Sequence, residues 1–400
     1  MNPEIRALFP GATEQIYLDV SARGLVPDPV REAAEAHLRV RQSVGGDKEE
    51  LRAGVERARS LFAELVHAAP EEVALTKNVS EGLNLFGASL PWEAGDNVVV
   101  CPGLEHPNNI YLWYNLQARR GIEVRTVEAE DGRLPVDAMA AAMDGRTRLV
   151  TLPSISFAPG FRSDVAGVSA AARAAGALTL VDAAQSVGAV ATDVDALGID
   201  ALAVATQKCL LGLYGTGFLY VRRAVADDLL PIHVARYGID LDGAHETAFS
   251  RGELRYRPGA LRFDLGNFNY LGAAAAGAAL ELLLGWGMEA VEAHLCGLAA
   301  RLAQGFLELG LPVAGGAPGP HLAHIVSVGR SGGGRHYTAD DPAMNALHRH
   351  LLDAGVRHSI RSGVLRFSVG VYNDADDIDR VLELAGAWAE ASGRDPEAAG

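Results

Sequence analysis

The sequence predicts an α/β protein with a mostly parallel sheet, because short apolar runs alternate with amphipathic segments along most of the chain. Helical patterns separate the apolar runs, which favours crossover connections with helices on both faces of the sheet. The 400 residues exceed what one hydrophobic core usually supports, so we expect two domains. The runs with the length and composition of buried strands are Asn97 to Cys101, Leu149 to Leu152, Ala177 to Val181 and Ala201 to Ala205.

We expect an N-terminal segment at 1–25, a large domain at 26–284 and a smaller C-terminal α/β domain at 285–391. The first segment contains a short extended stretch, Gln15 to Asp19, and Pro27 then opens a helix. A long Ala-rich helix, Leu271 to Trp286, leads into the smaller domain. Residues 225–262 resemble a long loop of the kind found at active sites or subunit contacts, and we expect the tail, 392–400, to be disordered.

Charge and composition exclude several classes of function. The net charge of -15 disfavours nucleic acid and anionic membranes as partners. No apolar run reaches the ~18–20 residues of a transmembrane helix, and the first residues lack a hydrophobic signal core. Three scattered cysteines indicate neither a disulfide framework nor paired metal ligands. We therefore expect a cytoplasmic protein that binds a small molecule.

An acid and a lysine follow two neighbouring predicted strands, at the edge of the sheet where ligand chemistry collects. Asp182 ends one strand, and Lys208 comes shortly after the next; it is one of only three lysines. A desolvated lysine can act as an amine nucleophile, whereas arginine cannot deprotonate. The pair favours a Schiff base with pyridoxal phosphate, whose ring nitrogen Asp182 would hold. A helix N-cap explains Asp182 equally well, since Gln185 follows three residues later.

A polar turn at Asn78 to Gly82 joins a strand to a helix and suits a phosphate, because a helix N-terminus presents free amides and a positive dipole. A simple N-cap with Glu81 in the first turn explains the same residues. Lys77 also follows a strand, but no acid is placed beside it as Asp182 is, so Lys208 is preferred. His106, on a strand-exit loop, fits a catalytic group or a helix cap.

Six stretches carry a family resemblance when they are read together and in order. They are Thr76 to Asn84, Glu105 to Ile110, Val181 to Gln185, Lys208 with Gly215 to Val221, Gly266 to Asn269, and Leu365 to Ser368 with Tyr372 and Asn373. Over roughly 15–390 the chain resembles the class V aminotransferase and cysteine desulfurase family of fold type I pyridoxal phosphate enzymes. The fold implied is that of a fold type I transferase, with a large parallel-sheet domain and a smaller C-terminal one.

The resemblance implies a role for each matching residue around the cofactor ring. Lys208 would form the Schiff base and shuttle the Cα proton, Asp182 would pair with the pyridinium nitrogen, and Gln185 would hydrogen-bond the phenolic oxygen. His106 would stack on the ring. The substrate carboxylate would bind Arg366 in a bidentate pair. A strand-edge charge is the alternative, and the register of Arg366 with Tyr372 and Asn373 favours the carboxylate role over it.

The resemblance also implies how the phosphate is held. The amides of Val79 and Ser80, the Ser80 hydroxyl and Thr206 would contact it. In this family the partner subunit usually completes the phosphate site from the segment that matches Asn267 to Tyr270, which includes Asn269. A homodimer with shared active sites is therefore implied.

The chain departs from the family in ways that bear on the reaction. Desulfurases carry a nucleophilic cysteine on a loop before the arginine strand, and the matching region, 355–363, has none. Cys101, Cys209 and Cys296 lie elsewhere, so persulfide-forming desulfuration is disfavoured. Gln207 and Phe157 replace a histidine and an asparagine of the family. Arg23 and Arg361 fit recognition of a second acidic group, or ordinary surface roles.

We therefore expect a pyridoxal phosphate enzyme that deprotonates the Cα of a small amino acid. Carbon–sulfur lyase or related β-elimination chemistry is favoured, because relatives without the loop cysteine include such enzymes. A class V aminotransferase, an amino acid epimerase and a non-catalytic binding protein are the alternatives, the last disfavoured by Lys208, Asp182 and His106. No metal is expected, because His321 and His324 would face opposite sides of a strand, and His348 and His350 diverge on a helix.

Overall fold

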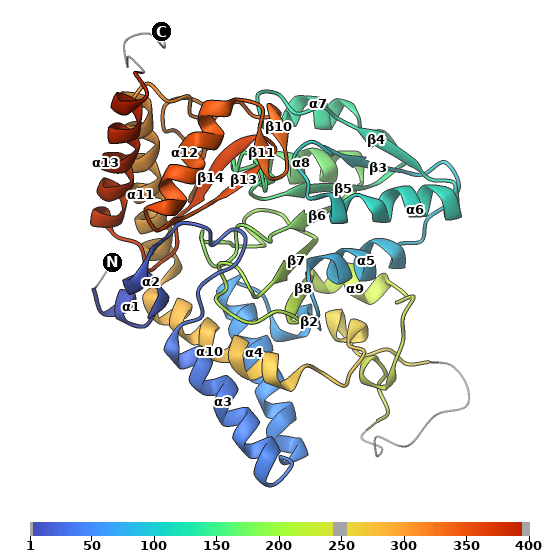
Figure 1. Cartoon of the computed structure of the whole chain (residues 1–400). Helices are drawn as coiled ribbons and strands as arrows, with labels where there is room; N and C mark the ends of the chain where they lie inside the picture. Colours follow the sequence, from blue (N-terminus) through green and yellow to red (C-terminus); the bar gives the residue numbers. More distant parts are fainter. Residues whose placement is uncertain (1–2, 243–253, 394–400) are drawn as a thin grey trace.

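The computed structural model describes residues 3–242 and 254–393, and it is built around a seven-stranded sheet with the order β2-β8-β7-β6-β5-β3-β4 (Figure 1). Strands β3 to β7 pair in parallel, whereas β8 is antiparallel to both β2 and β7. The predicted mostly parallel α/β sheet is thus confirmed. The strands are β2 (Val73–Thr76), β3 (Asn97–Val100), β4 (Glu123–Thr126), β5 (Thr147–Pro153), β6 (Leu178–Asp182), β7 (Ala201–Ala205) and β8 (Gly217–Val221).

Helices cover both faces of this sheet because successive side chains of a strand point to opposite faces. Val181 packs in the core shared with α4, α8 and α10, whereas Leu180 packs in the core shared with α5 and α6. Below the sheet, α10 packs against both α3 and α4 (Figure 1). The helices are α3 (Asp28–Ser43), α4 (Lys48–Leu65), α5 (Val79–Ser89), α6 (Tyr111–Arg120), α7 (Val136–Ala141), α8 (Val165–Ala175), α9 (Arg223–Asp228) and α10 (Tyr270–Trp286).

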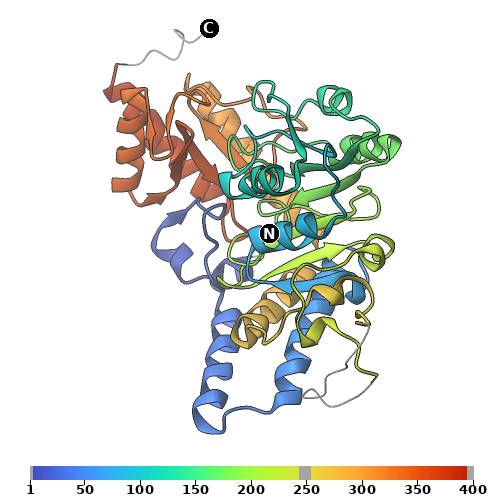
Figure 2. The same cartoon turned by 90° about the vertical axis from the view of Figure 1, so that its right-hand side faces the viewer.

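A second, antiparallel sheet of three strands, in the order β13-β14-β9, belongs to the C-terminal part. Helices α11, α12 and α13 pack around it at one end of the molecule (Figure 2). A small hairpin of β10 and β11, which the sequence did not predict, lies beside it. The elements are α11 (Met288–Glu308), β9 (Ile325–Val328), β10 (Gly334–Arg335), β11 (Thr338–Ala339), α12 (Pro342–Asp353), β12 (Val356–Arg357), β13 (Ser359–Arg361), β14 (Val364–Ser368) and α13 (Ala375–Ala391).

The N-terminal segment is tied to this C-terminal part. The predicted extended stretch contains β1 (Ile16–Tyr17), which pairs in parallel with β12. Two short helices precede it, α1 (Pro3–Ala7) and α2 (Gly11–Glu14), and Arg6 contacts Asp377 of α13 at 2.6 Å. Residues 18–24 then cross toward the carboxyl edge of the large sheet, where Gly24 donates a backbone hydrogen bond to Gln207.

The predicted long loop, 225–262, has more structure than expected in its described parts. It contains the end of α9 and two 3₁₀ segments, η3 (Arg236–Gly238) and η4 (Gly259–Phe263). Residues 243–253 of that loop, and 394–400 of the predicted tail, lie outside the described residues. Two further 3₁₀ turns are η1 (Pro70–Glu72) and η2 (Pro107–Asn109).

The helices of this fold are too short or too polar, taken singly, for a membrane span. Within 3–242 and 254–393, no single helix is long and apolar enough to cross a bilayer. Among the described helices, α10 and α11 reach that length and composition when taken together, and they are bent by 81° at their junction.

Candidate active site

The folding of β6 and β7 brings Asp182 and Lys208 to one edge of the large sheet. The two strands are parallel, with Asp182 opposite Ala203, and β7 ends three residues before Lys208. The N-terminal segment passes directly over the lysine: a Cβ added at Gly24 would lie 2.4 Å from the Lys208 carbonyl oxygen. Burial lowers the pKa of Lys208 and Arg366 lowers it further, while Asp182 opposes the shift. A larger fraction of Lys208 is therefore a neutral amine at a given pH.

Asp182 is held by two hydrogen-bond donors. Its Oδ2 accepts from the side-chain amide of Asn109, and its Oδ1 accepts from the Ala184 backbone amide at 2.9 Å. Burial raises the pKa of Asp182, and the Ala184 hydrogen bond and the charge of Lys208 counter that rise. Asn109 was not predicted as a site residue; its place in the Glu105 to Ile110 stretch was the only sequence signal.

Glu105 is a second buried carboxyl group near Asp182. Both of its carboxylate oxygens are buried, and among the described residues the Asn109 side chain is the hydrogen-bonding group that opposes the rise of its pKa. Burial, followed by the charge of Asp182, raises the pKa of Glu105 well above its usual range. Two carboxylates in one apolar site do not both ionise easily, so we assign the proton to Glu105 and the negative charge to Asp182.

His106 caps the turn that follows it, which is one of its two predicted interpretations. Its Nδ1 accepts the Asn108 backbone N–H at 3.3 Å, which caps the η2 turn. Its ring also lies edge-on to Phe157, with 5.5 Å between ring centroids. Burial and the charge of Lys208 lower the pKa of His106, which favours a neutral ring. The cap therefore fixes the ring beside the site.

Gln185 and Thr206 are buried on the same edge. Gln185 Nε2 donates to the Ser21 carbonyl at 3.2 Å, and its Oε1 has no partner. The Thr206 hydroxyl donates to the Leu213 and Thr216 carbonyls at 2.6 and 3.1 Å. To donate to a phosphate oxygen, the Thr206 hydroxyl would have to give up its hydrogen bonds to these two carbonyls. Its predicted phosphate role stays a prediction.

The predicted phosphate turn begins α5. Asn78 caps the helix by accepting the Glu81 amide at 2.9 Å, and Glu81 in turn accepts the Lys77 amide at 2.6 Å. This capping leaves the amides of Val79 and Ser80, the first two of the helix, without an intrahelical acceptor. An anion at this end would also gain from the helix dipole.

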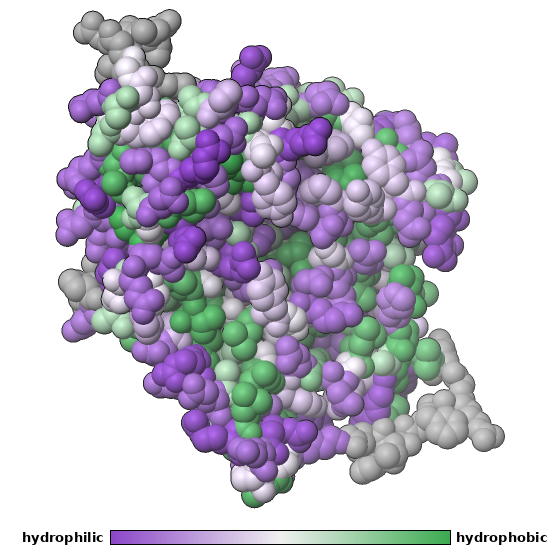
Figure 3. Space-filling view, viewed as in Figure 1, coloured by the Kyte–Doolittle hydropathy of each residue, from purple (hydrophilic) through white to green (hydrophobic). Residues whose placement is uncertain are grey.

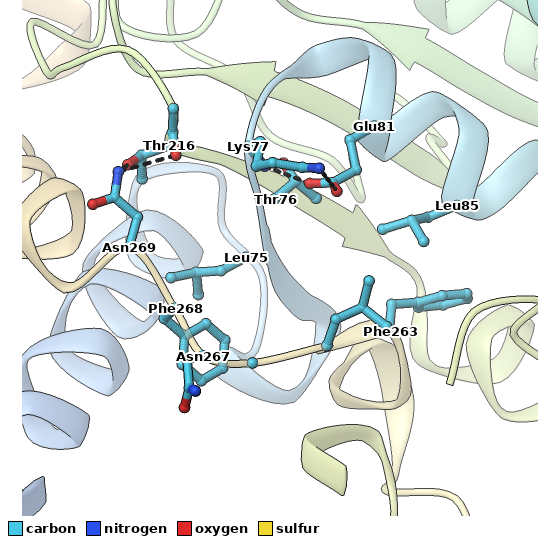
Figure 4. A pocket seen from close by; sticks show the side chains of 13 residues that line it. Leu75, Thr76, Lys77, Glu81, Leu85, Thr216, Phe263, Asn267, Phe268 and Asn269 are labelled. Carbon is cyan, nitrogen blue, oxygen red and sulfur yellow. Dashed lines mark hydrogen bonds and ion pairs between the residues drawn. The ribbon is translucent and has the colours of Figure 1, made fainter. Parts of the chain in front are cut away.

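A pocket opens beside this turn, between β2 and the segment that precedes α10 (Figure 4). Asn269 caps α10 and donates to the Thr216 hydroxyl at 3.1 Å, and Tyr270 follows as the first helical residue. Lys77 pairs with Glu81 at 3.0 Å, and its side chain is 72% exposed. Lys77 therefore faces solvent, as expected for the less suitable of the two strand-end lysines.

Arg366 is fully buried and only partly satisfied. Its Nη1 donates to the Phe157 carbonyl at 2.9 Å, and its Nη2 lies 3.6 Å from Asp19 Oδ1. No described residue accepts a hydrogen bond from its Nε. Burial lowers the pKa of Arg366 to about 10, a value that still leaves it protonated at neutral pH. A buried cation with an unused donor fits a ligand carboxylate.

Arg361 and Arg23 were the other predicted substrate contacts. In the antiparallel register Ser359 lies opposite Arg366, and Arg361 opposite Val364, so Arg361 and Arg366 share one face of the hairpin. Arg23 is exposed, and its carbonyl accepts the Tyr17 hydroxyl at 2.9 Å. The structure thus brings Arg361 to the face of Arg366.

The histidines weighed as metal ligands have other neighbours. His324 is buried against Ser21 and Cys209, and His348 contacts His358 at 2.9 Å. In the two described ranges, no group of three or more His, Cys, Asp or Glu side chains is placed to hold a metal ion.

The residues present fit pyridoxal phosphate on the chemistry of their donors. A buried amine, a buried carboxylate and uncapped helix amides match the aldehyde, the ring nitrogen and the phosphate of that cofactor. Among the described residues, Gln185 Oε1 and Arg366 Nε are buried polar atoms with no hydrogen-bond partner, as expected of atoms that contact a bound ligand.

Comparisons with known proteins give a family. A model of the class V aminotransferases matches residues 16–381. The chain is 33% identical over 298 residues to a probable cysteine desulfurase of Methanothermobacter thermautotrophicus, covering 73% of this chain and 72% of the relative. It is 31% identical to the uncharacterized aminotransferase YcbU of Bacillus subtilis, covering 78% and 80%.

The fold has close structural neighbours as well. The apo cysteine desulfurase of Thermococcus onnurineus superposes with a TM-score of 0.81 and 26% identity, covering 97% of this chain and 98% of that one. The expected fold type I architecture is therefore confirmed. With the family model spanning nearly the whole chain, this protein belongs to the class V aminotransferase family of pyridoxal-phosphate-dependent enzymes.

Proposed function

We propose that this enzyme cleaves the carbon–sulfur bond of cysteine or a cysteine S-conjugate by β-elimination, without a persulfide on the protein. The overall reaction converts the substrate and water into pyruvate, ammonia and a thiol, or sulfide from cysteine itself. Pyridoxal phosphate, when bound, supplies an electron sink for the negative charge that forms at Cα. The protein must bind the substrate, remove the Cα proton and protonate the leaving group.

The state of the three cysteines is the observation that carries this proposal. The chain has no others, and all three are free. Burial raises the pKa of Cys101 to about 11 and that of Cys209 to about 12, and it also raises the pKa of Cys296. Since a thiolate is the nucleophile in persulfide formation, none of the three is prepared for it at neutral pH.

Lys208 is the proposed base. Its lowered pKa increases the fraction of neutral amine that can accept the Cα proton near neutral pH. Arg366 would hold the substrate carboxylate through its Nε, which has no partner among the described residues. His106, positioned beside Phe157, would limit the tilt of the cofactor ring. Asp182, charged and held by Asn109, would keep the ring nitrogen protonated.

A homodimer in the cytoplasm is part of the proposal. Large apolar side chains are exposed on α3, at Leu38 and Val40, and at its C-cap Val44, and green surface spreads over the lower helices in Figure 3. Such exposed apolar patches are typical of interfaces. The segment Asn267 to Tyr270 would complete the partner's phosphate site. Three free cysteines and no disulfide suit a reducing compartment.

Transamination is the second candidate, because the relative YcbU is named an aminotransferase and is 31% identical. The test compares S-methyl-L-cysteine with and without added keto acids. Release of pyruvate and methanethiol that needs no keto acid supports elimination, whereas turnover that requires a keto acid and forms a new amino acid identifies an aminotransferase. If S-methyl-L-cysteine is not converted with or without a keto acid, the result favours a binding protein without catalytic turnover.

A further inference from the structure

The hairpin of β10 and β11 is an element that the proposed chemistry does not use. It is docked on the turn between β13 and β14, the hairpin that carries Arg361 and Arg366 (Figure 1). Gly363 donates its amide to the Arg335 carbonyl at 3.2 Å, and Gly332 donates to Ser362 at 2.9 Å. We call β10–β11 and β13–β14 together the paired hairpins.

Glycines make this docking close and fixed. Gly363 has φ +82°, and a Cβ there would lie 2.4 Å from the backbone carbon of Gly333. A Cβ at Gly334 would lie 2.3 Å from the Thr338 carbonyl oxygen. Only glycine combines this backbone conformation with so close an approach of two chains. The tip residues, His336 and Tyr337, are therefore held in a defined position relative to Arg361.

Contacts of the hairpin tip lead from Arg361 to Arg366 through three aromatic side chains. Tyr337 lies under the Arg361 guanidinium, 5.4 Å from its carbon, and its ring is 4.6 Å from that of His336. His336 faces Phe157 at 6.4 Å, and the Phe157 carbonyl accepts from Arg366. Phe157 also contacts His106, which is predicted to stack on the cofactor. This row of side chains therefore borders the predicted cofactor site.

The guanidinium of Arg361 is cationic and has donors to spare. Its Nη1 donates only to the neighbouring Ile360 carbonyl at 2.7 Å. No carboxylate of the described chain forms an ion pair with it, in contrast to Arg366, which has Asp19. Stacking on Tyr337 orients the guanidinium without using its hydrogen-bond donors.

We propose that the paired hairpins form the side-chain subsite of the enzyme and select amino acids that carry a second anionic group, which Arg361 binds with help from His336 and Tyr337. This inference rests on the proposed function, because the substrate carboxylate is taken by Arg366. Burial, then the charges of Arg361 and Arg366, lower the pKa of His336, so a neutral imidazole remains to donate one hydrogen bond. Tyr337 is 73% exposed, which leaves the subsite open to solvent at its outer side.

A pair of isosteric substrates tests the charge preference. S-carboxymethyl-L-cysteine has the second carboxylate, and S-carbamoylmethyl-L-cysteine replaces it with a neutral amide of the same shape. We expect the wild-type holoenzyme to prefer the acid by about 10–100-fold in kcat/KM, the range of a charge-assisted hydrogen bond. Arg361→Gln should remove most of that preference by lowering kcat/KM for the acid alone.

Two variants control the measurement. Arg349→Gln changes an exposed arginine of α12 and should leave the preference intact. Tyr337→Ala removes only the stacking partner and should reduce the preference by about 2–5-fold. Circular dichroism of each variant establishes that it is folded.

Binding of unreactive probes separates this inference from the proposed function. In calorimetry of the wild-type holoenzyme, succinate should bind about 10-fold or more tightly than its monoamide, and Arg361→Gln should remove the difference. This result would support the subsite even if no substrate were cleaved. Equal binding or equal turnover of acid and amide would overturn the inference while leaving β-elimination intact. An equal loss for both in Arg361→Gln would also overturn it, by placing Arg361 on the α-carboxylate.

Discussion

The side-chain amide of Asn109 donates a hydrogen bond to the carboxylate of Asp182, across the carboxyl edge of the large sheet. Asn109 comes from the η2 turn and Asp182 from the end of β6, so two elements far apart in the sequence meet there. The hydrogen bond stabilises the charged form of a buried acid whose pKa burial raises.

Asn109→Ala should therefore raise the pKa of Asp182 further. If Asp182 must be charged, the enzyme then loses activity at a higher pH as the pH falls. The acid limb of the kcat/KM profile should therefore shift to higher pH. The rate should fall about 10-fold or more near neutral pH. Asn108→Ala, at the exposed neighbour that contributes only its backbone amide, is the control. An unchanged acid limb in Asn109→Ala would argue against this role.

Lys208→Ala should abolish the visible absorbance of the lysine–cofactor Schiff base and the turnover with it. Lys77→Ala should preserve both, because Lys77 faces solvent and pairs with Glu81. The absorbance spectrum after incubation with pyridoxal phosphate is the measurement. A spectrum that depends on Lys77 and not on Lys208 would reverse the assignment.

Replacing each cysteine separately by alanine should leave sulfide release intact. The pKa of about 12 at Cys209 and about 11 at Cys101 keeps both thiols protonated at neutral pH, so neither can carry a persulfide there. Sulfide release and intact-protein mass spectrometry after incubation with cysteine are the measurements. A persulfide adduct that one substitution removes would identify a carrier.

Asp264→Asn should lower the free energy of unfolding by about 1–3 kcal/mol, because it takes one of two carboxylate partners from the buried Arg59 and leaves only Glu56 as its ion-pair partner. Arg59 Nη2 donates to Asp264 at 2.7 Å, and both side chains are almost fully buried. Asp379→Asn, in an exposed pair with Arg301, should cost only about 0–1 kcal/mol. Urea unfolding of both variants makes the comparison, and equal small losses would contradict it.

The sequence predicted the regular elements of the large sheet well. Strands such as Ala201–Ala205 are short apolar runs whose pattern depends on local composition, and the structure places them where they were expected. The shared edge of Asp182 and Lys208 was predicted because each residue follows the carboxyl end of a predicted parallel strand. These features are local, or follow from general rules of α/β topology.

Features that depend on contacts between distant segments were missed. The hairpin tip at His336 and Tyr337 lies in a glycine-rich stretch, and its strands are only two residues long, too short for a periodic pattern. The pairing of β1 with β12 joins opposite ends of the chain. Asn109 resembled an ordinary polar loop residue, since only the fold reveals that it meets Asp182.

The products formed from L-cysteine test the central claim most directly. β-Elimination without a persulfide predicts that the wild-type holoenzyme releases pyruvate and sulfide in equal amounts, with no keto acid added, and that Lys208→Ala releases neither. Alanine as the main product, with sulfur retained on a protein cysteine, would contradict the claim.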